Sequence, residues 1–322
     1  MPEISGSTTE LKISAAIKNL RKNFPGMEIL ENEPMANHCS FKAGGPARAF
    51  AAPLTQNDFF GTVSELKAQR VAPYILGNGT NVVFADEGVP KLFILSTANL
   101  QDIKLTDAHS IYAHCGVSLS RLASFALENS LSGLEFASGI PGTVGGGIIM
   151  DAGAYGGELK DCIKEVTALD METLDIVHLS NKDCAFGYRK SIFQDKRNLI
   201  VLGGEFNLSE GSKDEISSKM KELNARRRDK QPLDVPSCGS TFRRPAGYYA
   251  AALIDECGLR GCKIGGAQVS EKHAGFVINA GNATVKDLSD MIAYIQKTVF
   301  EKKNIELVPE AIIIPSDYSL KV

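Results

Sequence analysis

The hydrophobic residues of the 322-residue chain form alternating helical and extended stretches. Apolar side chains recur at helical spacing, which indicates helices with one buried face, over residues 8–24, 56–70 and 118–130. Shorter apolar runs predict strands at 92–96, 110–115, 163–170, 174–179 and 199–208. The run 74–84 predicts a strand, a tight glycine loop and a second strand. The pattern therefore indicates a mixed α and β chain.

A charged segment at 213–230 predicts a helix that joins two parts of the chain, with Ile216, Met220 and Leu223 on one side. Beyond it, residues 231–315 predict a compact unit with a helix near 248–257, a strand at 274–279, a helix at 285–302 and a final strand. Thr284 followed by Asp287 predicts a capped start for the long last helix.

The composition is that of an ordinary globular protein, with 43% hydrophobic and 23% charged residues. A formal net charge of −3 provides no positive field for nucleic acid or an anionic membrane. Seven cysteines without a C-x-x-C pair favour a reducing compartment over a disulfide framework or a metal site. Because the sequence shows neither a signal peptide nor a long apolar run, we expect a cytoplasmic protein that does not enter a membrane.

Glycine loops are the first candidate for chemistry. Gly77 and Gly79 form G-N-G after a predicted strand, but Val82 occupies the third glycine position of a dinucleotide-binding fingerprint. Glycines concentrate again between Gly133 and Gly157, at a cost in backbone entropy. Two interpretations remain open at this point: backbone N–H groups that converge on a phosphate, or crowded turns between strands.

Six longer sequence segments, taken in their order along the chain, indicate a protein family more specifically than any single glycine loop does. They read S-F-K-A-G-G-P-A (40–47), L-G-N-G-T-N (76–81), G-L-E-F-A-S-G-I-P-G-T-V-G-G-G-I-I-M-D-A-G-A-Y-G-G (133–157), F-G-Y-R-K-S-I-F (186–193), P-S-C-G-S-T-F-R-R-P (236–245) and I-G-G-A-Q-V-S-E-K-H-A-G-F-V-I-N (264–279). In this order the chain resembles the UDP-N-acetylenolpyruvoylglucosamine reductase family, from about residue 37 to residue 313.

The resemblance implies an α+β fold: an FAD-binding domain of the vanillyl-alcohol oxidase and p-cresol methylhydroxylase type, built from two α+β subdomains, and a C-terminal α+β substrate domain. We expect an N-terminal helical segment at 1–36, the FAD-binding domain at 37–209 and the substrate domain at 210–322. The absence of a histidine at the position used for covalent attachment implies non-covalent FAD. The implied cofactor-binding residues are Gly77, Asn78, Gly79, Thr80, Asn81, Ser138, Gly139, Ile140, Pro141, Gly142, Gly145 and Gly146.

The implied reaction is the NADPH-dependent reduction of UDP-N-acetylglucosamine enolpyruvate to UDP-N-acetylmuramate through FAD, in peptidoglycan synthesis. By the resemblance, Ser240 donates a proton to the enolate carbon, Arg189 pairs with the substrate carboxylate, and Glu310 polarises or protonates the intermediate. Each residue type also has an ordinary structural interpretation: a turn serine, a surface arginine and a solvated glutamate.

The resemblance also implies a substrate-binding set. Lys230 ends the basic run R-R-R-D-K (226–230) and matches a family lysine that contacts the substrate phosphates, although cations at a helix C-terminus are commonly just solvated. The other candidates are Arg244, His273 and Tyr188. No metal site is expected. Cys238 is interpreted as a bystander because no histidine partner would make it a thiolate.

The chain departs from the family pattern at Thr80, Asp151 and Val308, where serine, asparagine and glutamate are common. An anionic Asp151 near the flavin predicts a lowered redox potential. The short segment between Arg189 and Ser240 predicts the shorter family form, without an inserted tyrosine lid, and we expect a monomer. Two rival functions remain: an FAD oxidase or dehydrogenase acting on another sugar or alcohol, and a non-catalytic protein that binds nucleotide sugars.

Overall fold

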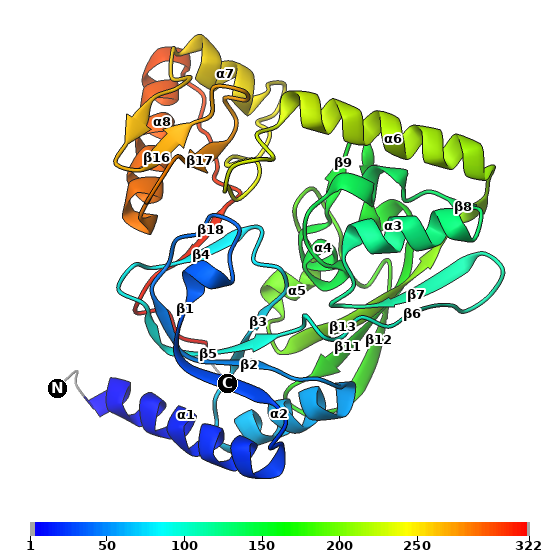
Figure 1. The fold of residues 1–322 in the computed structure, drawn as a ribbon, viewed down its shortest axis with the longest axis vertical. Coiled ribbons are helices and arrows are strands. Elements are labelled where there is room, and N and C mark those ends of the chain that lie inside the picture. The colour runs from blue at the N-terminus through cyan, green and yellow to red at the C-terminus, as the bar shows by residue number, and fades with distance from the viewer. Residues whose placement is uncertain (1–3, 321–322) are drawn as a thin grey trace.

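The computed structural model describes residues 4–320, which form three lobes (Figure 1). The first lobe holds a four-stranded sheet in the order β1 (Glu28–Pro34), β2 (Pro46–Ala52), β5 (Val89–Ser96) and β3 (Pro73–Leu76). β1 runs antiparallel to β2, whereas β2 and β3 run parallel to β5. Helices α1 (Ile4–Asn23) and α2 (Gln56–Ala68) place their apolar stripes in one core with Phe93 and Leu95 of β5.

The second lobe is built on a five-stranded antiparallel sheet in the order β12 (Ile176–Ser180), β11 (Ile163–Asp170), β13 (Leu199–Asn207), β7 (Ser110–His114) and β6 (Ile103–Leu105). Helices α3 (Leu119–Glu128) and α4 (Val144–Met150) share a core with this sheet. The long helix α6 (Lys213–Lys230) contributes Leu223 to that core and leads to the third lobe (Figure 1).

The third lobe packs α7 (Ala250–Glu256) and α8 (Val285–Lys303) with a small sheet in the order β15 (Lys263–Ile264), β16 (Ala267–Val269) and β17 (Val277–Asn279). Thr284 Oγ1 accepts a hydrogen bond from Asp287 N, and the Asp287 carboxylate accepts one from Thr284 N. The capped start predicted for the last helix is therefore confirmed.

The last strand, β18 (Ile312–Ile314), leaves the third lobe and pairs in parallel with β4 (Val82–Phe84) of the first. The sequence predicts this strand, but the prediction that it belongs to a compact C-terminal unit is wrong. Its hydrogen-bonding partner, β4, lies more than 200 residues earlier in the chain. The domain boundaries expected from the sequence remain a prediction.

The remaining elements are short: strands β8 (Leu131–Ser132), β9 (Gly153–Ala154), β10 (Gly157–Glu158) and β14 (Ser209–Glu210), helix α5 (Ile192–Asp195) and the 3₁₀ turns Met35–Asn37, Glu135–Gly139 and Leu159–Asp161. Within residues 4–320, no helix is long and apolar enough to cross a bilayer. The same residues contain no group of three or more histidine, cysteine or acidic side chains arranged to hold a metal ion.

Candidate active site

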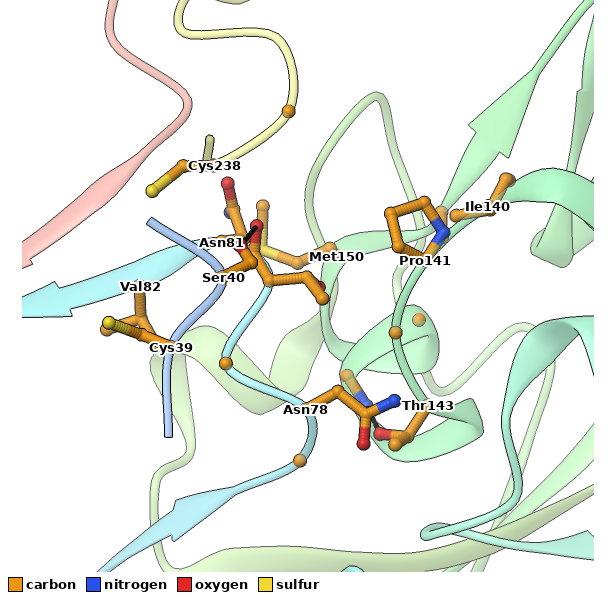
Figure 2. A pocket seen from close by; sticks show the side chains of 18 of the residues that line it. Cys39, Ser40, Asn78, Asn81, Val82, Ile140, Pro141, Thr143, Met150 and Cys238 are labelled. Carbon is orange, nitrogen blue, oxygen red and sulfur yellow. Dashed lines mark hydrogen bonds between the residues drawn. The ribbon is translucent and has the colours of Figure 1, made fainter. Parts of the chain in front are cut away.

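A cleft with a volume of about 1300 Å³ lies where the lobes meet. Figure 2 shows part of its wall, with Asn78 and Asn81 on one side, Ile140, Pro141 and Thr143 on another, and Cys238 on a third segment. The wall also includes Arg189, Ser240 and Glu310, which belong to three separate parts of the chain. The cleft is therefore formed by tertiary structure and not by one sequence motif.

The first glycine loop connects β3 to β4 along this wall. Gly79 has a φ of +59°, and a Cβ there would lie 2.0 Å from the His38 carbonyl oxygen. A Cβ on Gly77 would lie 2.5 Å from Thr143 Oγ1, so the second loop packs directly against the first. Glycine is required at both positions, because a side chain at Gly77 would collide with the second loop and one at Gly79 would collide with the backbone of His38.

The second glycine loop precedes α4. Thr143 caps this helix, with its hydroxyl accepting a hydrogen bond from Gly146 N. The backbone N–H groups of Gly142 and Thr143, like those of Asn78, Gly79 and Thr80 in the first loop, have no acceptor within residues 4–320. Unsatisfied amides on two opposed glycine loops, beside a cleft of this size, suit a phosphate group. The residues present therefore fit the diphosphate of FAD.

Twelve residues were predicted to bind the cofactor, and nine of them line the cleft: Gly77, Asn78, Gly79, Thr80, Asn81, Ile140, Pro141, Gly142 and Gly146. The other three support the loop from behind. Ser138 Oγ donates to Glu135 O, Gly139 O accepts from the Arg227 side chain, and Gly145 N donates to Cys115 O. A direct contact with the cofactor remains a prediction for all twelve.

Arg189 and Glu310 are brought into contact across the cleft wall. Arg189 Nε donates to Glu310 Oε1 at 2.6 Å, while Nη1 and Nη2 donate to the carbonyl oxygens of Asp151 and Gly153, both at 3.2 Å. Because a guanidinium carries five N–H donors, two remain for a bound anion. Arg189 has a φ of +56°, and its carbonyl oxygen accepts from Gln194 Nε2.

Glu310 is held between two parts of the cleft. Its backbone N–H donates to Thr241 O at 2.8 Å, and its carbonyl oxygen accepts from Asn81 Nδ2 at 3.1 Å. Burial raises the pKa of the Glu310 carboxyl, against the opposing effects of the nearby Arg189 and Arg243. A buried carboxyl with a raised pKa keeps its proton to a higher pH than a solvated carboxyl does.

Ser240 lies on the segment that pairs with the backbone around Glu310, next to Thr241. The segment is anchored by Ser40 Oγ, which donates to Ser237 O at 2.6 Å. Ser240 itself is exposed on the cleft wall, and within residues 4–320 its hydroxyl has no hydrogen-bond partner. Burial raises the pKa of the nearby Cys238 thiol to about 12, which agrees with its interpretation as a bystander.

The four residues expected to bind substrate lie outside the residues that line the cleft. Lys230 is exposed at the end of α6. His273 Nδ1 accepts from Gly275 N, and burial lowers the pKa of its ring. Tyr188 lies beside the site, with its ring 5.0 Å below the Arg189 guanidinium and its hydroxyl accepting from Arg244 N. Their roles in substrate binding remain predictions.

The Asp151 side chain does not line the cleft. It is fully buried, and Oδ1 accepts from Lys160 N at 3.0 Å while Oδ2 lies 3.6 Å from Lys160 Nζ. Burial raises the pKa of this carboxyl. The neighbouring ammonium group would compensate an anionic Asp151, which weakens the physical argument for a lowered flavin potential.

The cleft lining includes further residues that were not named as site residues from the sequence, among them Arg227, Tyr155 and His38. Arg227 had a usable signal, because it continues the apolar stripe of Ile216, Met220 and Leu223 by one helical turn. Tyr155 has a φ of +54° in the tight β9–β10 connection. His38 stacks on Phe50 and pairs with Glu33, contacts that only the tertiary structure provides.

Comparison with known proteins identifies the class of protein. A family model described as "FAD binding domain" matches residues 47–180, which include both glycine loops. The model described as "UDP-N-acetylenolpyruvoylglucosamine reductase, C-terminal domain" matches residues 231–314. The fold and the cleft therefore define an FAD-binding oxidoreductase, and the predicted fold class is confirmed.

Full-length relatives identify the family. The UDP-N-acetylenolpyruvoylglucosamine reductase of Caldanaerobacter subterraneus is 49% identical over 88% of this chain and 92% of its own length. That of Clostridioides difficile is 44% identical over 90% and 94%. The crystal structure of the Thermus caldophilus reductase superposes with a TM-score of 0.75 at 32% identity, covering 90% of this chain and all of that one. The chain belongs to the UDP-N-acetylenolpyruvoylglucosamine reductase family.

Proposed function

We propose that this chain is a UDP-N-acetylmuramate dehydrogenase, which uses NADPH and FAD to reduce the enolpyruvyl group of UDP-N-acetylglucosamine enolpyruvate in peptidoglycan synthesis. The main structural support is that Arg189, Ser240 and Glu310 share one cleft wall with two glycine loops whose amides are unsatisfied. A rival FAD oxidase would need the loops but not this trio. A simple nucleotide-sugar binder would need neither a raised carboxyl pKa nor the trio.

Bound FAD supplies the hydride for the methylene carbon of the substrate. The protein's part is to receive the charge that develops on the neighbouring carbon and its carboxylate. Arg189 is suited to this part because Glu310, Asp151 O and Gly153 O hold its guanidinium while two N–H donors stay free. We assign Arg189 to the substrate carboxylate.

The carbon that bears this charge then needs a proton. Ser240 is the donor in this proposal, since its hydroxyl reaches the cleft without a competing partner in residues 4–320. Glu310 shares the wall, and its raised pKa suits it to hold a proton in the same site. NADPH and the sugar are proposed to use the cleft in turn.

Anaerobic stopped-flow absorbance of the flavin tests the proposal. NADPH is expected to bleach the yellow protein, and the UDP-enolpyruvyl sugar is expected to restore the colour. A protein whose flavin is bleached by another sugar or an alcohol, and is not recoloured by the UDP-enolpyruvyl sugar, would be the rival oxidase or dehydrogenase. A purified protein that neither carries flavin nor bleaches would contradict the proposal.

The proposal also covers the oligomeric state and the cellular compartment of the protein. We propose a cytoplasmic monomer of the shorter family form, with an open cleft. All seven cysteines are free thiols, six of them buried, which is compatible with a reducing compartment. Size-exclusion chromatography with light scattering checks the monomer.

A further inference from the structure

Arg243 is a half-buried arginine beside the site, and its charge has no carboxylate partner. Its Nε is fully buried and has no acceptor, and within residues 4–320 its guanidinium makes neither an ion pair nor a hydrogen bond. A guanidinium keeps its proton at accessible pH, so this cation does not become neutral in response to its surroundings. A charged donor without a partner costs free energy, and an anion within reach lowers that cost.

The backbone places Arg243 diagonally across from Glu310. The segments that carry the two residues form an antiparallel bridge, in which Arg243 N donates to Val308 O and Glu310 N donates to Thr241 O, both at 2.8 Å. This register sets Val308 directly opposite Arg243 and Glu310 one diagonal step away. Side chains alternate along extended backbone, so both charged side chains lie on the same face, at a spacing that a long side chain spans.

The position directly opposite Arg243 offers no charge. Val308 is apolar and 49% exposed, so it neither pairs with the guanidinium nor covers it. Glu310 is therefore the carboxylate that the register brings within reach of Arg243. Because Arg243 does not line the cleft, its charge acts on the site through Glu310 and not through a contact with a bound ligand.

Glu310 is surrounded by neutral groups apart from two arginines. The backbone of Thr241 and the amide of Asn81 hold its main chain from two different parts of the molecule. Arg189 pairs with its carboxylate at 2.6 Å. Within the described residues, Arg189 and Arg243 are the charged groups that act on this carboxyl, and both lower its pKa against the effect of burial.

We infer that Arg243 is a positioning residue of the proposed reaction, whose guanidinium acts on Glu310 across the paired segments and sets the pH range in which Glu310 holds a proton. The inference rests on the proposed function, because it gives Arg243 no role apart from Glu310. A fixed cation stabilises the ionised carboxylate more than the neutral carboxyl, so Glu310 releases its proton at a lower pH than it would beside Arg189 alone.

The first test follows sugar-dependent reoxidation of the flavin across neutral and alkaline pH, by anaerobic stopped-flow absorbance. Arg243→Met keeps most of the length of the side chain and removes its charge. The alkaline limb of the rate profile is expected to move to higher pH by about half a unit, which is about a threefold change in the protonated fraction of Glu310. Arg243→Lys keeps a cation and is expected to stay close to the wild-type profile. Arg121→Met, exposed on α3 and not among the groups that act on Glu310, is the control.

The second test needs no turnover. Urea unfolding of the full-length wild type, Arg243→Met, Glu310→Gln and the double variant forms a cycle that isolates the interaction of the pair. Since Glu310 is charged only above its pKa, a favourable coupling is expected at alkaline pH and none at about pH 4. Arg243→Met therefore loses more stability at alkaline pH than at acid pH, and Glu310→Gln abolishes this difference. A side chain that serves packing alone would cause a loss that depends on neither.

An unmoved alkaline limb in Arg243→Met, or a coupling that is equal at both pH values, would overturn the inference. If Arg243→Met does not fold, Val308→Glu replaces it, because a carboxylate directly opposite Arg243 competes with Glu310 for the guanidinium. This variant is expected to move the limb in the same direction, whereas Val308→Gln is expected to leave it in place, and an unmoved limb in Val308→Glu would again overturn the inference. A wild-type protein without flavin, or without sugar-dependent reoxidation, would instead contradict the proposed function, and the unfolding cycle would still test the pair.

Discussion

Two residues of the cleft lining, and one buried behind it, have an unfavourable backbone conformation. Asp151, Tyr155 and Arg189 are not glycines, yet their φ angles are +42°, +54° and +56°. Each such residue costs about 1–2 kcal/mol relative to a right-handed conformation. The Arg189 guanidinium binds the carbonyl oxygen of Asp151, so these local costs produce the arrangement that orients the guanidinium. These three residues therefore adopt left-handed conformations next to the proposed binding position of the substrate carboxylate.

Replacing Ser240 by alanine tests the proposed proton donor. Because Ser240 contributes a hydroxyl only to the second half-reaction, flavin reduction by NADPH is expected to survive. Flavin reoxidation by the UDP-enolpyruvyl sugar is expected to slow by about 10²–10⁴-fold, the usual range for a lost general acid. Anaerobic stopped-flow absorbance measures both steps. Ser218→Ala on the exposed face of α6 is the control. Equal slowing of both half-reactions would argue against the assignment.

Asp151→Asn tests the buried carboxyl. Burial raises its pKa in the folded protein, so its contribution favours folding at low pH and is lost as the pH rises through the folded-state pKa. The amide carries no charge and tolerates positive φ. We expect the free energy of unfolding of the variant to exceed that of the wild type by about 1 kcal/mol at pH 8. This difference in stability is expected to shrink near pH 4. Urea titrations across this range measure it.

Asp151→Asn also removes the ion pair between Asp151 and Lys160, which opposes the gain in stability. This loss is limited, because the Lys160 ammonium keeps Glu158 as an anionic partner. Potentiometric titration of the bound flavin adds a second measurement. The Lys160 pairing predicts similar potentials for the two proteins. A clear rise in the variant would favour the sequence-based hypothesis of an uncompensated anion. Parallel pH profiles of stability would contradict the buried-charge argument.

At the scale of elements, the cleft depends on loops more than on helices or sheets. The two glycine loops are in contact, and each exposes backbone donors that no helix or strand uses. A side chain added at their closest point would separate them. That point is Gly77, whose Cβ would lie 2.5 Å from Thr143 Oγ1. Gly79 is even more restricted, since its Cβ would lie 2.0 Å from the carbonyl oxygen of His38, which belongs to neither loop.

Gly79→Ala is therefore expected to lower the unfolding free energy by at least about 2 kcal/mol and to weaken FAD binding more than tenfold, because positive φ and a backbone collision act together. Gly26→Ala is the matched control, since its Cβ would meet nothing within 4 Å and its φ is not positive. Thermal unfolding and flavin fluorescence measure both variants. Tight FAD binding by Gly79→Ala would show that the loop is not a rigid contact surface.

Long periodic elements were predictable from the sequence, and short or non-local ones were not. The predicted helix at 213–230 has the observed bounds of α6. The predicted last helix agrees with α8 to within one residue, because its apolar residues repeat at helical spacing and a capping box marks its start. β1 was missed, since the pattern of Glu28–Pro34 is mostly polar and exposed. β2 was missed as well, although most of Pro46–Ala52 is apolar and buried. The pairing of β18 with β4 depends on contacts that no local pattern encodes.

The candidate site was predictable to a similar extent. The order of the motifs predicted that Arg189, Ser240 and Glu310 share a site, and all three line the same cleft. The basic run at 226–230 was predicted to supply the cations for a diphosphate, with Lys230 as the named residue, but a basic run alone does not indicate which of its members faces inward. Arg227 lines the cleft and Lys230 does not, and their roles in binding remain predictions. The helical phase of α6 separates them, since Arg227 lies on the buried stripe and Lys230 does not.

In the whole molecule, the first and third lobes are joined by several hydrogen bonds between distant residues. The Asp86 carboxylate of the first lobe accepts from the backbone N–H groups of Val285 and Lys286, at the start of α8. Asn279 Nδ2 donates to Phe41 O at 3.0 Å. These contacts complement the helix dipole and bury polar groups in pairs. The two lobes therefore form one scaffold, on which β18 carries the chain from Glu310 back to the first lobe.

This scaffold leads to a final prediction about β18. Ile314 is 3% exposed in the core that includes Phe84, whereas Ile312 of the same strand is 40% exposed. Ile314→Ala is expected to lower the unfolding free energy by about 2–4 kcal/mol, and Ile312→Ala by less than about 1, because only the former leaves a cavity. Urea unfolding followed by flavin fluorescence measures both.

The same two variants report on the site. Glu310 lies four residues before Ile314, and its carbonyl oxygen accepts a hydrogen bond from Asn81 in the first glycine loop. Loosening β18 is therefore expected to slow sugar-dependent reoxidation of the flavin in Ile314→Ala even under conditions where the protein is folded, while Ile312→Ala reacts like the wild type. If the two variants are equally stable and equally active, the strand is not the element that holds Glu310 against the first lobe. The position of the proposed proton carrier would then depend on the third lobe alone.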